Sequence, residues 1–238
     1  FLWPSFFYNI LLMMKKFIFI ILSVLTVSAY AGNVSWLRYP SISPDGKSVV
    51  FSYGGDLYIV ASEGGEARKL TSHQAYDYSP VWSPDGKTIV FASDRFGNFD
   101  IYKVSVKGGV PQRLTTNSAK ETPWTFTPDG KSILFTARIQ DPASSVLFPK
   151  SSMTELYSVS IEGGRPHQVL ATPAEEISFV GNTGTFLYQD CKGGENIWRK
   201  HHTSSITRDI WMYDGANHTK LTDFKGEDRT PRVSADGK

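Results

Sequence analysis

The chain has 238 residues, enough for one or two domains, and a formal net charge of +2. So small a charge gives no broad field toward nucleic acid or a membrane surface, and we predict neither as a partner. Hydrophobic residues make up 40% of the chain and aromatic residues 13%, which is typical of a packed globular protein. The single cysteine, Cys191, excludes an intramolecular disulfide.

The N-terminal stretch has the pattern of an export signal. Residues 1–12 contain no methionine, and we interpret them as upstream read-through, the alternative being a longer hydrophobic leader. Residues 13–31 contain two lysines, an apolar run too short to span a membrane comfortably, and the small-x-small sequence Ala-Tyr-Ala. We therefore predict a signal peptide that is cleaved before Gly32, and an exported, periplasmic protein without a stable membrane anchor. The alternative reading of this stretch is an uncleaved anchor.

A turn sequence recurs along the rest of the chain. It is Ser-Pro-Asp-Gly-Lys at residues 43–47 and 83–87, Thr-Pro-Asp-Gly-Lys at 127–131, and Ser-Ala-Asp-Gly-Lys at 234–238. Proline presets φ at the second turn position, aspartate bonds nearby backbone N–H groups, and glycine takes the left-handed conformation. The first three copies are followed by β-branched runs, as expected of antiparallel hairpins. We predict structural roles in these turns for Asp45, Gly46, Asp85, Gly86, Asp129 and Gly130.

Each repeat contains four short strand signals. An acidic-apolar-aromatic triplet follows in every repeat, a Gly-Gly turn in the first three, and a final Leu-Thr in most copies. Four strands at a period of about 40–45 residues predict an all-β fold, a β-propeller of four-stranded blades. The predicted blades are residues 36–71, 76–115, 121–171 and 175–223, with the start of another at 227–238, all within a partial propeller at 32–238. A parallel β-helix, the rival fold, would show shorter and more uniform coils.

Two long insertions separate the second and third strands of a repeat. They occupy residues 138–153 in the third unit and 191–208 in the fourth. Because antiparallel strands alternate in direction, both insertions are expected on one face of the propeller, where long loops on a rigid scaffold often carry function. The second insertion contains cations suited to binding a carboxylate or an acidic partner. They are Arg199, Lys200, His201, His202 and Arg208.

The chain carries no catalytic or metal-binding motif. It has no Gly-x-Ser-x-Gly elbow and no phosphate-binding glycine loop. His201 and His202 stand near Ser204, Ser205 and Asp209, but adjacency in sequence does not supply the spatial convergence of a triad. The other histidines are scattered and there is no Cys-x-x-Cys. We predict no catalytic residue, no metal site and no cofactor within this chain.

Two stretches of the chain, residues 148–157 and 198–211, resemble signatures of the tricorn protease family, and the repeats resemble TolB-type and WD40-like (PD40) units. The resemblance runs from about residue 33 to the end and matches the family's first propeller, so six blades are expected. It implies an S41-class serine peptidase in which propellers gate a chamber and later domains hold the catalytic residues. It also implies a basic pair that holds a peptide C-terminus before the third blade, where this sequence has only Lys120.

The resemblance favours one function over two others. The leading hypothesis is the substrate-gating and scaffolding propeller of an exported tricorn-like serine peptidase involved in peptide degradation. Its implied partners are peptides or unfolded polypeptide, the remaining domains of the same protein and, at full length, further copies of it. The alternatives are a non-catalytic, TolB-like periplasmic binding propeller and the propeller of a prolyl-oligopeptidase-type exopeptidase. A cytoplasmic location, as in archaeal family members, is the alternative to export.

Overall fold

The computed structural model describes residues 36–139, 153–193 and 203–234. The chain divides into residues 1–36 and 37–238, and every strand described here belongs to the second part. Among the described residues no helix is long and apolar enough to cross a membrane. The predicted read-through, signal peptide and cleavage site lie outside the described residues.

The strands form four antiparallel sheets, each built from four consecutive strands. The first sheet contains β1 (Arg38–Ile42), β2 (Ser48–Tyr53), β3 (Asp56–Ala61) and β4 (Arg68–Lys69). The second contains β5 (Asp77–Trp82), β6 (Thr88–Ser93), β7 (Asp100–Ser105) and β8 (Gln112–Arg113). The third contains β9 (Thr122–Phe126), β10 (Ser132–Ala137), β11 (Glu155–Ser160) and β12 (His167–Leu170). The fourth contains β13 (Ala174–Phe179), β14 (Phe186–Asp190), β15 (Ile210–Tyr213) and β16 (His218–Lys220).

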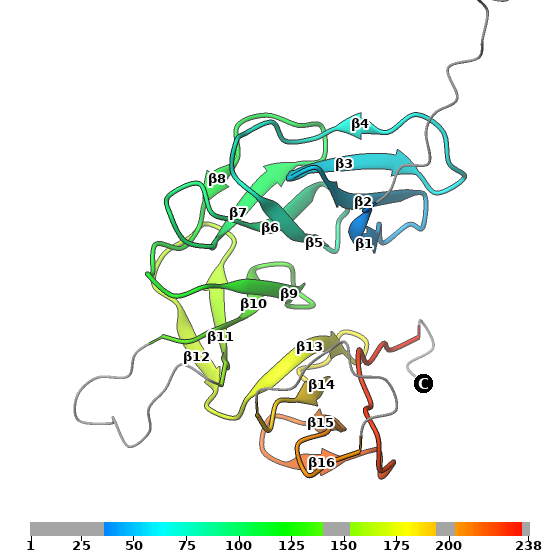
Figure 1. Ribbon diagram of the computed structural model, residues 1–238, viewed down its shortest axis with the longest axis vertical. Helices are drawn as coiled ribbons and strands as arrows, with labels where there is room; N and C mark the ends of the chain where they lie inside the picture. Colours follow the sequence, from blue (N-terminus) through cyan, green and yellow to red (C-terminus); the bar gives the residue numbers. More distant parts are fainter. Residues whose placement is uncertain (1–35, 140–152, 194–202, 235–238) are drawn as a thin grey trace, which may run out of the picture. The chain divides into compact units, whose positions relative to one another are not determined.

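These sheets are blades of a β-propeller, which confirms the predicted fold class (Figure 1). The first strands of the four blades, β1, β5, β9 and β13, lie nearest the centre, and β4, β8, β12 and β16 lie at the rim. Successive innermost strands are neighbours, β1 with β5, β5 with β9, and β9 with β13. The blades therefore follow one another around the centre in chain order.

The repeated turn has the same hydrogen bonds in each of the first three blades. In the second blade the Ser83 hydroxyl donates to Asp85 Oδ1 at 2.6 Å, and the Lys87 amide donates to the same oxygen at 3.1 Å. These bonds hold the pKa of Asp85 below its usual value, the serine hydroxyl contributing most. Gly86 closes the turn with φ of 67°, in the left-handed region that favours glycine.

An acidic residue stands at the start of the third strand in all four blades and bonds to a side chain of the fourth strand. Asp56 is mostly buried and pairs with Lys69 at 2.7 Å. The equivalent pairs are Asp100–Arg113 at 2.7 Å and Asp209–Lys220 at 2.9 Å. In the remaining blade Gln168 donates to Glu155 at 2.9 Å. The acidic residue of the triplet thus has a structural role in each blade: its side chain bonds the third strand to the fourth.

The Leu-Thr that ends a repeat has a matching role. The Thr71 hydroxyl accepts the Leu57 amide at 2.9 Å, and Thr115 accepts the Ile101 amide at the same distance. The preceding leucines, Leu70 and Leu114, are buried. Because β4 and β8 are only two residues long, these side-chain bonds extend the pairing of the rim strands beyond their backbone ladders.

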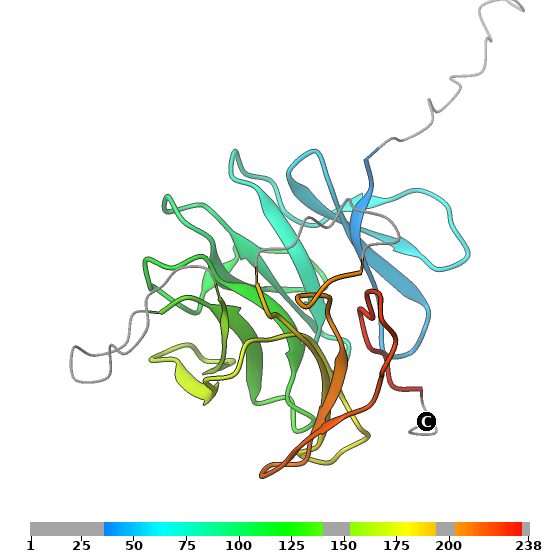
Figure 2. The same ribbon diagram turned by 60° about the horizontal axis from the view of Figure 1, so that its bottom comes forward.

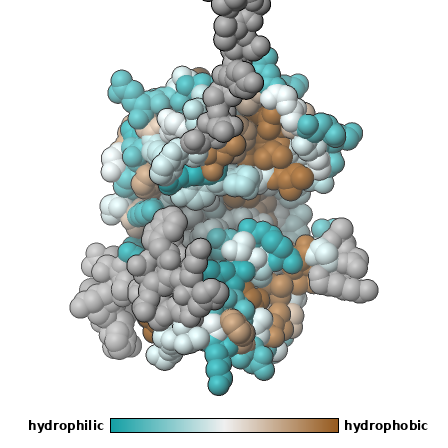
Figure 3. Space-filling view, turned by 45° about the vertical axis from the view of Figure 1, so that its right-hand side comes forward, coloured by the Kyte–Doolittle hydropathy of each residue, from teal (hydrophilic) through white to brown (hydrophobic). Residues whose placement is uncertain are grey.

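The apolar core lies between blades. One cluster joins Val50 and Leu57 of the first blade to Ile89 and Phe91 of the second. A further cluster joins the second blade to the third, and another joins the third to the fourth. On the face of the first blade that points away from the second, Ile42 and Tyr53 are exposed among the described residues. Figure 3 shows apolar side chains gathered on that side of the molecule.

The turn geometry predicts unequal effects for two neighbouring substitutions. Gly86→Val places a β-branched side chain at φ of 67° and should lower the free energy of unfolding by about 1–2 kcal/mol. Lys87→Ala removes only a side chain that is 80% exposed, with one ion pair at 3.7 Å, and should change it by less than about 0.5 kcal/mol. Denaturant titration of the full-length protein, followed by tryptophan fluorescence, measures both. Equal losses would contradict the turn assignment.

Candidate functional site

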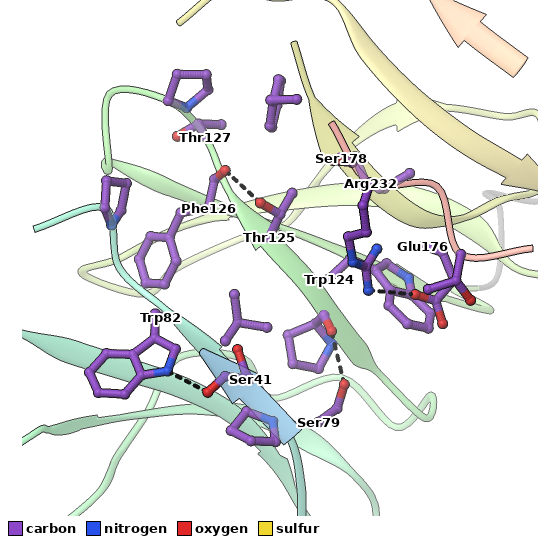
Figure 4. Close-up of a pocket in the computed structure, with 18 of the residues that line it drawn as sticks. Ser41, Ser79, Trp82, Trp124, Thr125, Phe126, Thr127, Glu176, Ser178 and Arg232 are labelled. Carbon is purple, nitrogen blue, oxygen red and sulfur yellow. Dashed lines mark hydrogen bonds and ion pairs between the residues drawn. The ribbon is translucent and has the colours of Figure 1, made fainter. Parts of the chain in front are cut away.

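The innermost strands surround a central cavity of about 570 Å³ (Figure 4). Most of its described lining is aromatic, proline or small hydroxyl-bearing, including Trp82, Trp124 and Ser79. The Trp82 indole donates to the Ser41 carbonyl at 2.9 Å, and the Ser79 hydroxyl donates to the Pro123 carbonyl at 3.2 Å. These bonds join one innermost strand to the next, so that the wall of the cavity is continuous from the first blade to the third.

β-bulges interrupt the innermost strands where they face this cavity. In β5, Ser79 and Pro80 stand between the paired residues Tyr78 and Val81, whose partners on β6 are only two apart. The first bulge residue has positive φ in three blades: 52° at Tyr39, 53° at Ser79 and 55° at Glu176. All three line the cavity. Non-glycine residues seldom adopt this conformation, and bulges re-aim side chains near binding sites, so the strain coincides with the candidate site.

One ion pair supplies the charge of the described cavity lining. Arg232 Nη2 lies 3.3 Å from Glu176 Oε2, and the Val233 amide donates to the Ser178 hydroxyl oxygen at 3.1 Å. The segment that carries Arg232 therefore lies alongside β13, as the red trace beside the fourth blade shows (Figure 2). Because Glu176 and Arg232 neutralise one another, the described wall presents no net charge to the cavity.

An aromatic cluster with a lysine lies at the end where the innermost strands begin. We call Tyr39, Tyr78, Phe99 and Lys120 the mouth cluster. The Tyr78 ring centroid is 5.4 Å from that of Tyr39 and 4.9 Å from that of Phe99. Lys120 Nζ lies 5.4 Å from the Tyr78 centroid and 5.3 Å from the Phe99 centroid, within cation–π range. Burial raises the pKa of Tyr78 to about 12, so its hydroxyl stays protonated.

Residues 34–236 match the family model described as the tricorn protease N-terminal beta propeller domain. The chain belongs to this family. The crystal structure of the tricorn protease has a TM-score of 0.63 and 23% identity, with 80% of this chain and 18% of that chain covered. A TolB structure from Agrobacterium tumefaciens has a TM-score of 0.61 and 22% identity, covering 82% and 68%. At these identities the likeness shows the fold alone.

Curated relatives match shorter stretches of this tricorn-family propeller. The uncharacterized peptidase YuxL of Bacillus subtilis (strain 168) is 43% identical over 70 residues, which is 25% of this chain and 11% of the relative. A TolB homolog of Chlorobium luteolum is 49% identical over 43 residues, which is 18% of this chain and 10% of the relative. The aligned part of the chain thus spans about a tenth of the length of these relatives.

Lys192 connects the two ends of the second insertion of this tricorn-family propeller. Its ammonium donates to the Thr207 carbonyl at 2.6 Å and bonds to Asp209 Oδ2, with Asp190 Oδ2 3.4 Å away. Burial opposes the charge of Asp209, but the bonds from Lys192 and Lys220 outweigh it and lower the pKa of the carboxyl. These contacts tie the two ends of the insertion together across the end of β14.

Arg208, a predicted partner-binding residue, lies inside the fourth blade. It is only 8% exposed, with Nη2 3.5 Å from Glu175 Oε2 and 3.9 Å from Cys191 Sγ. Within the part of the chain that the structure describes, its Nε and Nη1 have no hydrogen-bond partner. Lys120, in contrast, is exposed at the mouth cluster, and the two cations have different neighbours. A role for either in binding a partner stays a prediction.

The other predicted residues fall into two groups. Arg199, Lys200, His201 and His202 lie outside the described residues. The turn residues lie at the opposite ends of the strands from the described ends of the insertions, and a small cleft brings Asp45 next to Asp85 and Gly86. No group of three or more metal-ligating side chains occurs among residues 36–139, 153–193 and 203–234.

Sequence reasoning missed Tyr78, Phe99, Glu176 and Arg232. The local signal near them is that two of the bulges begin directly before a proline, at Tyr39-Pro40 and Ser79-Pro80. That pattern indicates the end of a loop as readily as a bulge in a strand.

The Lys192 contacts predict a local weakening when the ammonium is removed. Lys192→Met should lower the free energy of unfolding by about 1–2 kcal/mol, because Asp209 loses a hydrogen bond to a charged donor. Limited proteolysis should also cut residues 193–207 faster than in the wild type. Lys87→Ala, on the opposite face, serves as control and should change neither quantity. Unchanged cleavage in Lys192→Met would show that this residue does not hold the insertion.

Proposed function

We propose that this chain is the substrate-gating, N-terminal propeller of an exported, tricorn-like serine peptidase. In this proposal the catalytic residues belong to other domains of the same protein, and the propeller admits peptides or unfolded polypeptide to them. Homo-oligomerisation at full length is part of the same proposal. The family match over residues 34–236 is the observation that carries it.

The chemistry of the cavity supports an extended polypeptide as the molecule admitted. Backbone edges and hydroxyls of the innermost strands can hydrogen-bond to peptide groups of any sequence, and Trp82 and Trp124 offer apolar surface. The paired charges of Glu176 and Arg232 leave no strong preference for charged segments. Lys120, at the mouth cluster, is placed to attract a carboxylate, such as a peptide C-terminus.

The export signal is proposed from sequence. Residues 13–31 combine basic, apolar and small-residue segments in the order of a cleavable signal, which supports a periplasmic location. The cationic segment at residues 199–202 remains a proposed partner-binding element, together with Arg208.

A non-catalytic TolB-like binding propeller is the second candidate. The 49% identity to a TolB homolog over 43 residues favours it, as does the TolB structure with a TM-score of 0.61. The two candidates differ in whether the full-length protein carries a serine nucleophile. A fluorophosphonate probe distinguishes them: the gating proposal expects labelling of the full-length protein outside this chain, with Ser204 and Ser205 unlabelled. A protein that is not labelled at all would favour the binding propeller.

Narrowing the cavity tests the gating role. Thr125 lines the cavity on β9, and Thr125→Trp in the full-length protein adds bulk there. We expect kcat/KM for a long unfolded polypeptide to fall about tenfold, the equivalent of about 1.4 kcal/mol, relative to kcat/KM for a chromogenic tripeptide. The matched control is Thr219→Trp on the exposed rim strand β16, which should leave the ratio unchanged.

The two results separate gating from general damage. If Thr125→Trp lowers activity on both substrates alike, the cavity is not the entry route. If both tryptophan variants lower the ratio equally, the effect does not belong to the cavity, and gating by this propeller is contradicted.

A further inference from the structure

Two acidic residues occupy the same place at the junctions before the second and third blades. Asp77 begins β5, and its amide donates to the Gly55 carbonyl of the preceding blade at 2.8 Å. Glu121 directly precedes β9, and its amide donates to the Phe99 carbonyl of the preceding blade at 2.9 Å. Gly55 and Phe99 are themselves equivalent, each standing before the acid that opens the third strand. Both acidic residues are 0% exposed.

Asp77 has a counter-ion from its own blade. Arg95 lies two residues after the end of β6, and its Nη2 is 2.8 Å from Asp77 Oδ2. The side chain of Arg95 is only 11% exposed, so the pair is shielded from water. A buried carboxylate needs such a partner, because removing a charge from water is otherwise costly.

The third blade lacks the corresponding base. The residue two positions after the end of β10, equivalent to Arg95, is Ile139, and it packs against the apolar cluster between the second and third blades. In the fourth blade the base is present as Lys192, but the acid is replaced by Ala174, and Lys192 bonds to Asp209 instead. Only the third blade, among those described, keeps the buried acid without its base.

The surroundings of Glu121 favour a neutral carboxyl. Its Oε2 accepts from the Thr115 hydroxyl, and its Oε1 has no hydrogen-bond partner among the described residues. The charged groups that act on it are Asp100 of β7 and Arg113 of β8, and Arg113 already pairs with Asp100 at 2.7 Å. Burial raises the pKa of Glu121 to about 7, with the Asp100 charge adding to the effect and the Thr115 and Arg113 contacts opposing it.

Glu121 also stands directly beneath the mouth cluster. The preceding residue, Lys120, lies over the Tyr78 and Phe99 rings. The Tyr78 hydroxyl is 3.0 Å from Thr122 Oγ1 and 3.5 Å from the Glu121 carbonyl. The contacts that join the second blade to the third at this end therefore involve the Glu121 backbone and the two residues that flank it.

We propose that Glu121 is a proton-dependent latch between the second and third blades: the protonated side chain keeps the junction closed, and its ionisation loosens the junction beneath the mouth cluster. The proposal rests on the missing base, the complete burial and the junction contacts of Glu121 and the two residues that flank it. It does not depend on the function proposed above.

The direction of the pH effect follows from proton linkage. The pKa of Glu121 is about 7 in the closed junction, against an ordinary value of 4.5 when the carboxyl meets water. The closed junction therefore binds the proton more tightly than the open one, and its stability falls as pH rises from about 4.5 through about 7. The local opening equilibrium should increase about tenfold between about pH 6 and pH 8 and level off above that range.

Hydrogen exchange in the full-length protein tests the latch with an internal control. After correction for intrinsic exchange rates, protection of residues 114–122 should fall about tenfold from about pH 6 to pH 8. Residues 70–78 make the matching bonds at the junction before the second blade, where Asp77 is paired with Arg95. Their protection should stay constant. Equal pH dependence at both junctions, or none at residues 114–122, would overturn the proposal.

Two variants sharpen the test. Glu121→Gln is a neutral isostere, and it should keep the low-pH protection of residues 114–122 at all pH values. Glu63→Gln, which changes an exposed glutamate, should behave as the wild type. A pH response that persists in Glu121→Gln would assign it to another group and contradict the latch. Should Glu121→Gln fail to fold, the comparison of the two junctions in the wild type still decides.

Discussion

Apolar packing between successive blades is the constraint on which the rest of this structure depends. Hydrogen-bonded strand pairing stays within each four-stranded sheet, and each apolar cluster contains residues of two neighbouring blades. A single blade thus has no core of its own, as in other repeat folds whose units are stabilised by their neighbours. The turns and the side-chain bridges hold each sheet together, so that it can present an apolar face to the next sheet.

The polar groups follow from the same arrangement. Packing the blades face to face buries the first residues of several strands, among them Asp56, Asp77 and Asp100. Burying these carboxylates would cost free energy without their lysine or arginine partners. The innermost strands meet at the centre, and their bulges leave a cavity there. The proposed gate uses that cavity, and the proposed latch lies where one of the buried acids has lost its base. The cavity thus follows from a feature that every blade shares, whereas the latch depends on a departure from the repeat.

The repeats made the fold predictable, because proline, aspartate and glycine in one turn constrain the backbone locally. The site was less accessible, because its determinants are not local. Glu121 looks like Asp77 in sequence, and only the substitution of Ile139 for a base 18 residues later distinguishes them. From the sequence, Arg208 is expected to be an exposed cation. The structure instead buries it against Glu175 of β13, the innermost strand of the same blade. The positive φ of Ser79 and Glu176 has no residue-type signature, since neither is glycine.

A double-mutant cycle on the cores tests the central claim, that stability resides in pairs of adjacent blades. Val50→Ala in the first blade and Ile89→Val in the second affect one cluster, whereas Ile133→Val in the third affects another. Unfolding free energies of the full-length protein should show a coupling of about 0.5 kcal/mol or more for Val50→Ala with Ile89→Val. Val50→Ala with Ile133→Val should be additive. Additivity in both pairs, or equal coupling in both, would contradict the account.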